Sequence, residues 1–232
     1  MSDLTIVIGN KNYSSWSMRP WLALKKTGRE FREENILLRQ AETKGRILSH
    51  SGAGKVPILK HDQKHGQVSV WESLAICEYL ADTFPDAGLW PADKAARAHA
   101  RAASSEMHAG FARLRENMPM DVTRDRRRES RADLVQDEIA RIAHIWREAR
   151  QNFGAKVQDD AGKGDFLYGA FTAADAMFAP VVSRFRTYGV RLDEICTRYM
   201  NAVLEWPGFK EWEAGALAET AVIEFDVFSR PR

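Results

Sequence analysis

A change from strand to helix signals within the first 28 residues constrains the fold more than any other feature of the sequence. Residues 4–8 form an apolar run typical of a β-strand, and residues 21–26 carry apolar and polar side chains at helical spacing. The segment between them is rich in hydroxyl groups, which belong to Tyr13, Ser14, Ser15 and Ser17. A helix N-terminus has unpaired backbone N–H groups and the positive end of the dipole, so hydroxyls placed there would meet a bound anion or thiolate at a favourable position.

The hydroxyl cluster has two interpretations. Serine is common at helix caps, so one interpretation makes Ser17 the N-cap and puts Pro20 in the first turn, where its missing N–H costs no hydrogen bond. The other is that one hydroxyl contacts a ligand. The local sequence favours the capping role, and the choice depends on what the rest of the chain brings to the same place.

The composition limits the partners and the compartment. A formal net charge of +2 gives no large basic surface for nucleic acid, and no stretch approaches the roughly 18 apolar residues of a membrane helix. The chain begins Met-Ser-Asp-Leu, without the basic and apolar leader of a secreted protein. Cys77 and Cys196 form no motif, and His61 and His65 lack further metal ligands. We therefore expect a cytoplasmic protein with reduced, buried thiols, no bound metal, and neither nucleic acid nor membrane as a partner.

Residues 1–82 alternate between strand and helix patterns. Beyond the first strand and helix, the predicted elements are a strand at residues 35–38, a short helix within residues 39–55, strands that begin at Val56 and span residues 67–70, and a helix that begins at Glu72 and Ser73. The last two strands are separated only by a turn, so they are expected to pair as an antiparallel hairpin. The order βαβαββα predicts an α/β domain built on a mixed sheet.

Pro57 is unusual because it stands at the start of a strand that should be central, where a proline removes a hydrogen-bond donor from the sheet. A cis Val56–Pro57 bond would turn the chain so that Val56 offers its N–H and C=O outward to a ligand. The alternative is an edge strand with an ordinary trans proline. The sequence leaves both open.

The strand patterns stop after a stretch rich in proline, glycine and aspartate at residues 83–93. Beyond it apolar residues recur at helical spacing, for example at Met107, Phe111, Leu114 and Met118, ahead of Pro119. We therefore predict an α/β domain at residues 1–82, a linker at residues 83–92 and an all-helical domain at residues 93–232. Thr172 and Asp175 are spaced as a capping box and predict a helix start.

Three separated features should meet at one end of the sheet. They are the hydroxyl cluster, the Val56–Pro57 pair and the helix start at Glu72–Ser73. The helix start offers N–H groups and a hydroxyl to a carboxylate, Glu72 offers a negative partner to an amine, and Val56 offers strand-like backbone pairing. The combination suits a small anionic peptide.

This combination resembles the cytosolic glutathione transferase family, over nearly the whole chain. Residues 13–19 are similar to the serine motif of the zeta class, S-S-C-x-W-R, with Trp16 in place of its cysteine and Met18 in place of its tryptophan. The resemblance implies a thioredoxin-like N-terminal domain followed by an all-helical C-terminal domain. It also implies glutathione as co-substrate and a homodimer.

The resemblance assigns roles to the matching positions. Ser14 would hydrogen-bond the glutathione sulfur, with Ser15 as the runner-up and Tyr13 third. The remaining glutathione contacts would come from Val56, the cis Pro57, Glu72, Ser73, Lys55 and Lys44. Met107, His108 and Phe111 are candidates for the wall that holds a second substrate, although the same residues could belong to the core.

The implied activity is attack of a glutathione thiolate on a small hydrophobic electrophile, or glutathione-dependent isomerisation as in the zeta class, whose substrate is maleylacetoacetate. A glutathione-dependent thiol reductase would need a cysteine at the strand-to-helix turn, and residues 10–20 contain none. A further alternative is a non-catalytic glutathione-binding or assembly module on the same fold.

Overall fold

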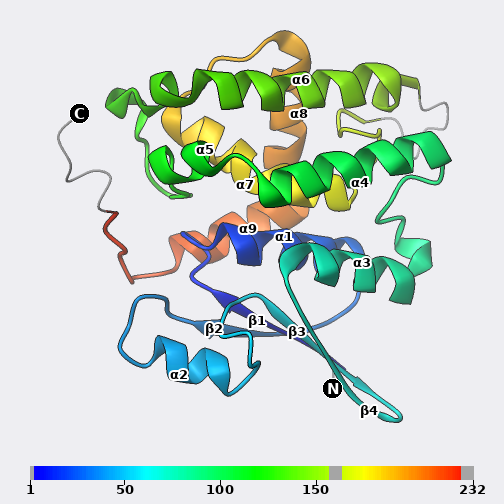
Figure 1. Ribbon diagram of the computed structural model, residues 1–232, viewed down its shortest axis with the longest axis vertical. Coiled ribbons are helices and arrows are strands. Elements are labelled where there is room, and N and C mark those ends of the chain that lie inside the picture. The colour runs from blue at the N-terminus through cyan, green and yellow to red at the C-terminus, as the bar shows by residue number, and fades with distance from the viewer. Residues whose placement is uncertain (1–2, 157–163, 226–232) are drawn as a thin grey trace.

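The computed structural model describes residues 3–156 and 164–225, which form a four-stranded sheet covered by helices (Figure 1). The N-terminal elements are β1 (Leu4–Gly9), α1 (Ser15–Lys26), β2 (Arg32–Ile36), α2 (Thr43–Leu48), β3 (Ile58–Gln63), β4 (Gly66–Trp71) and α3 (Ser73–Thr83). This order is the predicted βαβαββα. Among the described residues, no helix combines the length and the apolarity that a membrane crossing requires.

The sheet is mixed, with the strand order β2-β1-β3-β4. β1 pairs parallel with β2 and antiparallel with β3, and β3 and β4 form the predicted antiparallel hairpin. Side chains alternate between the two faces, so Ile6 and Ile8 join the large core under the helices, while Val7 packs with Ile36 and Ile58 against α2. Figure 1 shows α1 and α3 on one face of the sheet and α2 on the other.

The bounds of the second and third strands differ most from the prediction. The second strand is Arg32–Ile36 rather than residues 35–38, because pairing with β1 selects the register of this charged edge strand. The third strand begins at Ile58 rather than at Val56, and the Val56–Pro57 bond just before it is cis.

The expected N-cap of the first helix was wrong. Ser14 is the N-cap, and its hydroxyl accepts a hydrogen bond from the Ser17 backbone N–H. The helix therefore starts at Ser15, and Pro20 lies inside it rather than in its first turn. Ser14 and Ser17 both have a side chain that can cap a helix, so the local sequence does not separate them. In the folded protein the Ser17 hydroxyl accepts a hydrogen bond from the N–H of Gly9 instead.

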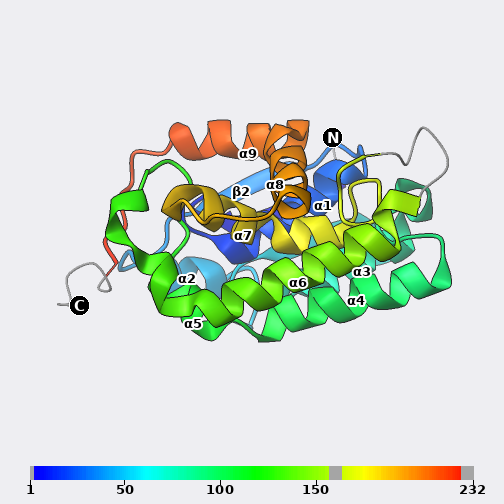
Figure 2. The same ribbon diagram turned by 90° about the horizontal axis from the view of Figure 1, so that it is seen from above.

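The remaining elements are helical. They are the short 3-10 helices η1 (Pro85–Ala87), η2 (Arg127–Glu129), η3 (Arg131–Val135) and η4 (Gly154–Lys156), and the α-helices α4 (Lys94–Ala109), α5 (Ala112–Asn117), α6 (Gln136–Asn152), α7 (Ala173–Tyr188), α8 (Glu194–Glu205) and α9 (Pro207–Leu217). The pattern from Met107 to Met118 is split between α4 and α5, because Phe111 adopts a left-handed backbone conformation between them. Figure 2 shows α7 in the middle of this part, with α4 and α6 running side by side.

The two parts of the chain share one hydrophobic core. Helix α1 packs between the sheet and the helical part, in contact with α3, α7 and α9. Trp21 of α1 meets Trp212 of α9 edge to face, with 5.3 Å between the ring centroids, and both side chains are buried. The N-terminal end of α1 is therefore positioned by both parts of the protein.

The capping box at the start of α7 is confirmed. The Asp175 carboxylate accepts hydrogen bonds from the backbone N–H groups of Thr172 at 2.7 Å and Leu167 at 3.0 Å. Complete burial raises the pKa of Asp175 to about 6, although these bonds favour the charged form.

We expect Asp175→Ala to lower the free energy of unfolding by about 2–4 kcal/mol, because it removes the cap and leaves two buried N–H groups without an acceptor. The measurement is the midpoint and slope of urea unfolding. Asp93→Ala is a matched control, because Asp93 caps α4 through one bond to the N–H of Ala96 and should cost only about 1 kcal/mol. Equal losses in the two variants would contradict the structural role assigned to Asp175.

Candidate functional site

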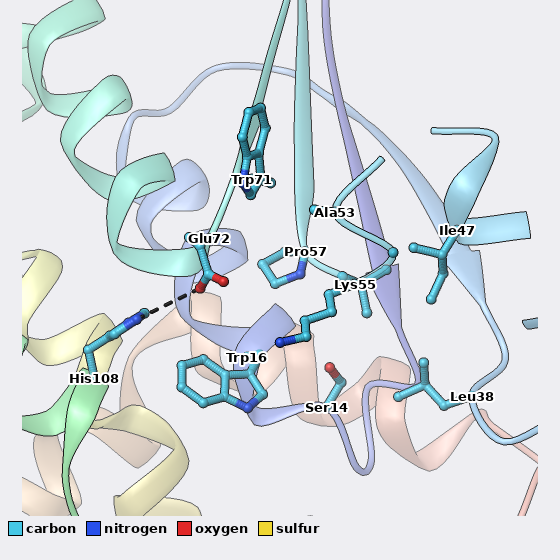
Figure 3. Close-up of a pocket in the computed structure, with 12 residues that line it drawn as sticks. Ser14, Trp16, Leu38, Ile47, Ala53, Lys55, Pro57, Trp71, Glu72 and His108 are labelled. Atoms are coloured by element: carbon cyan, nitrogen blue, oxygen red, sulfur yellow. Dashed lines mark ion pairs between the residues drawn. The ribbon is translucent and has the colours of Figure 1, made fainter. Parts of the chain in front are cut away.

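A cleft of about 470 Å³ opens where the sheet and the helical part meet (Figure 3). Its size is that of a small-molecule site. The lining residues come from the start of α1, the segments around α2 and β3, the end of β4 and helix α4, and they are Ser14, Trp16, Leu38, Ile47, Ala53, Gly54, Lys55, Val56, Pro57, Trp71, Glu72 and His108. The structure therefore brings the three sequence features together in one place.

Ser14 presents its hydroxyl to the cleft (Figure 3). Its oxygen lies 2.8 Å from the Ser17 hydroxyl oxygen and 3.3 Å from the Ser17 backbone nitrogen, which donates to it. The Ser17 oxygen in turn accepts a hydrogen bond of 3.0 Å from the N–H of Gly9, at the end of β1. These contacts connect the last residue of the strand with the first turn of the helix.

The loop that carries Ser14 is also attached to the helical part. Asn12 donates through its amide to Asp121 at 3.2 Å, and its backbone N–H donates to the carboxylate of Glu219 at 3.1 Å. On the sheet side, the Asn10 side-chain oxygen accepts a bond of 2.8 Å from the Leu38 N–H. The hydroxyl is therefore held by a loop with little freedom to move.

The cis Val56–Pro57 bond confirms one of the two alternatives that the sequence left open. Val56 belongs to no strand, and within the described residues neither its N–H nor its C=O forms a hydrogen bond. Because Val56 lines the cleft, this backbone pair is available to an extended peptide. Lys55, next to it, extends across the cleft toward Trp16 and Ser14 (Figure 3).

Glu72 and Ser73 lie at the start of α3. Glu72 has a φ of 70°, which an L-residue adopts only at a cost of about 1–3 kcal/mol, and its carboxylate lines the cleft. Ser73 is fully buried, and its hydroxyl oxygen has no hydrogen-bond partner among the described residues. A polar ligand would supply a partner for the buried Ser73 hydroxyl, next to the strained backbone of Glu72.

His108 reaches the cleft from α4, on the helical side. Its Nε2 is 3.7 Å from a Glu72 carboxylate oxygen, and its ring meets the Trp16 ring edge to face at 5.2 Å. Burial, followed by the positive charge of Arg19, lowers the pKa of His108 below its usual range. Of the three residues considered for a second wall, His108 lines the cleft, whereas Met107 and Phe111 are buried in the core.

Two positively charged side chains lie close to Trp16, which lines the cleft. The guanidinium groups of Arg19 and Arg115 lie 4.4 and 4.9 Å from the centre of the Trp16 ring. Arg19 is completely buried, and none of its side-chain nitrogens has a hydrogen-bond partner within the described parts of the chain. Burial lowers the pKa of Arg115 and lowers that of Arg19 well below its usual range. A guanidinium starts from so high a pKa that the pair stays positive, which makes the cleft more favourable for an anion.

The other candidates from the sequence lie outside the lining. Ser15 is buried at the first helical position, Tyr13 packs edge to face on Phe225 with 5.7 Å between centroids, and Lys44 is exposed on α2. Their proposed contacts stay predictions.

Sequence reasoning named Trp16 only as part of the serine motif and gave it no role in the cleft, and it missed the lining residues Leu38, Ile47, Ala53, Gly54 and Trp71 altogether. No local pattern marks them, because they reach the cleft only through the register of the sheet and the path of the chain around α2.

Comparison with known proteins gives a consistent result. The family model described as the glutathione S-transferase N-terminal domain matches residues 13–83, and that of the C-terminal domain matches residues 95–214. A protein of Caenorhabditis elegans named probable maleylacetoacetate isomerase is 42% identical over 97 residues, which are 42% of this chain and 42% of that protein's length.

Solved structures share the fold. A glutathione transferase homologue from Burkholderia with bound glutathione is 22% identical, with a TM-score of 0.66 over 94% of this chain and 100% of that one. A glutathione S-transferase from the Antarctic clam Laternula elliptica is 21% identical, with a TM-score of 0.66 over 91% of this chain and 92% of that one.

The His108 imidazole should titrate below the ordinary histidine range when followed by NMR, because its charged form is buried next to arginines. Glu72→Gln should lower this pKa further, since the carboxylate is the neighbour that favours the protonated ring. An unchanged or higher midpoint in Glu72→Gln would contradict the contact across the cleft.

Proposed function

The chain belongs to the glutathione S-transferase family, and from that premise we propose that it binds glutathione in the cleft and activates the sulfur as a thiolate. One observation carries the proposal. The Ser14 hydroxyl shares a single cleft with Glu72, at the start of α3, and with the Val56 backbone, which has no hydrogen-bond partner among the residues described. The Ser14 hydroxyl is a polar group for the sulfur, the Val56 backbone is complementary to a peptide backbone, and the start of α3 is complementary to the charged end of the peptide.

We assign the peptide contacts as follows. The Val56 N–H and C=O pair with the cysteinyl backbone, as an added strand would. Glu72 binds the amine of the γ-glutamyl end, and the first turn of α3 with the Ser73 hydroxyl binds its carboxylate. Lys55 approaches the second carboxylate of glutathione, and Pro57 shapes the turn that exposes Val56. Lys44 would need a change in its side chain or in the α2 segment to take part.

Ser14 is the activating residue in this proposal. A free thiol has a pKa of about 8.5, so only a few per cent is thiolate at neutral pH. Making it mostly ionised takes a shift of about two units, or ~2.7 kcal/mol. A hydroxyl hydrogen bond, the start of α1 and the positive charges of the buried Arg19 and the half-buried Arg115 all favour the anion. Ser15 and Tyr13 are less suited, because neither lines the cleft.

Glutathione supplies a thiolate nucleophile when it is bound, and the electrophile would occupy the space between Trp16, Trp71 and His108. The substrate is a small electrophile that is conjugated or isomerised. Isomerisation is supported by the similarity to the probable maleylacetoacetate isomerase. Conjugation is supported by the partly apolar wall of the cleft.

Two alternatives are less well supported. A thiol reductase needs an accessible reactive cysteine, whereas Cys77 is buried and burial raises its pKa to about 12. A non-catalytic module would not need the Ser14 hydroxyl in the cleft.

The finer organisation is also part of the proposal. Domain limits of residues 1–82 and 93–232 are supported by the end of α3 at Thr83 and the start of α4 at Lys94. We propose a homodimer, as the family resemblance implies, and the exposed Trp71 at the end of β4 is an apolar residue that such contacts could cover. A cytoplasmic location is supported by two free, buried cysteines.

Ser14→Ala should abolish the ultraviolet absorbance of bound glutathione thiolate at pH 7 while leaving glutathione binding nearly intact, because the hydrogen bond to the sulfur is lost and the contacts with the rest of the peptide remain. The ratio kcat/KM should fall by about 10- to 100-fold. Ser15→Ala is measured beside it. Loss of the thiolate in Ser15→Ala alone would move the assignment by one residue, and retention in both would refute hydroxyl activation.

A panel of electrophiles tests the reaction type. We expect glutathione-dependent turnover of at least one aromatic halide, enone or maleyl compound, with isomerisation followed by the loss of the cis double bond. Glutathione binding with no turnover of any compound would favour the non-catalytic module.

Glu72→Gln should weaken glutathione binding by about tenfold or more, because a charged partner of the amine is removed.

A further inference from the structure

We propose that Ser17 is a positioning residue that directs the Ser14 hydroxyl proton into the cleft. This inference rests on the proposed function, since it explains how Ser14 comes to be a donor toward the sulfur. Ser17 itself is completely buried and lines no part of the cleft. It therefore acts through Ser14 and does not touch the ligand.

The argument follows from counting donors and acceptors. A serine hydroxyl has one proton to donate and two lone pairs to accept with. Among residues 3–156 and 164–225, the Ser14 oxygen has two hydrogen-bond neighbours, and both belong to Ser17: the backbone N–H at 3.3 Å and the hydroxyl at 2.8 Å. The Ser17 oxygen also accepts the N–H of Gly9 at 3.0 Å.

The proton between the two hydroxyls can lie on either oxygen, and the two arrangements differ in what they leave unpaired. If Ser14 donates to Ser17, both lone pairs of Ser17 are filled, by Ser14 and by Gly9. The Ser17 proton then has no acceptor among the described residues, at a position closed to water. A buried donor without a partner carries its full desolvation cost.

If Ser17 donates to Ser14, no buried group is left over. Ser17 then fills both lone pairs of Ser14, one with its N–H and one with its O–H, and the Ser14 proton is left for the cleft, where water or sulfur can accept it. The second arrangement is therefore favoured, and it makes Ser14 a donor only.

The chain of bonds also strengthens the donor. Gly9 N–H to Ser17, Ser17 O–H to Ser14 and Ser14 O–H to the sulfur all run in one direction, and successive hydrogen bonds polarise one another in a buried setting. The chain begins at the end of β1, so the position of the last donor is set by the sheet. A Cβ on Gly9 would lie 2.7 Å from the Leu38 side chain, so glycine allows β1 to end this close to its neighbour.

The test compares the pKa of glutathione bound to the full-length wild type, Ser17→Ala and Ser17→Thr, read from thiolate absorbance across pH. We expect Ser17→Ala to raise this pKa by about 0.5–1 unit, which is about three- to tenfold less thiolate below it. Ser17→Thr keeps the hydroxyl and should stay within about twofold of the wild type. The kcat/KM of Ser17→Ala should recover at alkaline pH, which a structural defect would not allow.

Ser183→Ala is the matched control, because Ser183 is an equally buried serine on α7, outside the cleft. It should leave the bound-thiol pKa unchanged. If Ser17→Ala does not fold, Ser17→Val against Ser17→Thr makes the same comparison at similar shape, with and without the hydroxyl.

The outcomes separate the positioning role of Ser17 from the proposed activation of glutathione by Ser14. A raised pKa in Ser17→Ala with recovery in Ser17→Thr supports the positioning role. An unchanged pKa, or a loss of activity that is equal at every pH, overturns it, and the proposed function still stands if Ser14→Ala removes the thiolate. If Ser14→Ala also leaves the thiolate intact, the proposed function itself fails.

Discussion

The hydrogen-bonded connection between the end of β1 and the first turn of α1 is the contact on which the site depends. The Gly9 N–H, the Ser17 hydroxyl and the Ser14 hydroxyl lie in sequence from the sheet to the cleft. A hydrogen bond can favour a thiolate only if its donor is already in position when the ligand arrives. The buried packing of α1 between the sheet, α7 and α9 provides that rigidity.

The cleft combines two kinds of support for an anion. One is local, from the hydroxyl and the helix start, and the other comes from the guanidinium groups of the buried Arg19 and the half-buried Arg115. Arg19 and Arg115 place positive charge next to Trp16, and burial together with this charge lowers the pKa of His108. A buried guanidinium without a partner is costly to the fold, so the helical part contributes an electrostatic environment as well as a wall.

Strain and unpaired groups also gather around this cleft. Glu72 adopts a positive φ, and the Ser73 hydroxyl and the Val56 backbone have no partners within the residues described. The backbone strain at Glu72 and the buried Ser73 hydroxyl each cost the folded protein free energy, and a peptide ligand would pair with the Ser73 hydroxyl and with the half-buried Val56 backbone. Their concentration at the ends of the strands distinguishes the cleft from the capping box at Thr172 and Asp175, where every group is paired.

The sequence by itself determined the order of the elements, the β3–β4 hairpin and the capping box, because periodicity and turn residues act over short distances. It also indicated the hydroxyl cluster and the alternatives at Pro57. Only the tertiary structure decided that Ser14 caps α1 and faces the cleft, that His108 lines the cleft while Met107 does not, and that Lys44 is exposed on α2. A rule based on local sequence treats neighbouring serines such as Ser14 and Ser17 alike. Their roles differ because packing between two distant parts of the chain sets the direction in which the start of α1 points.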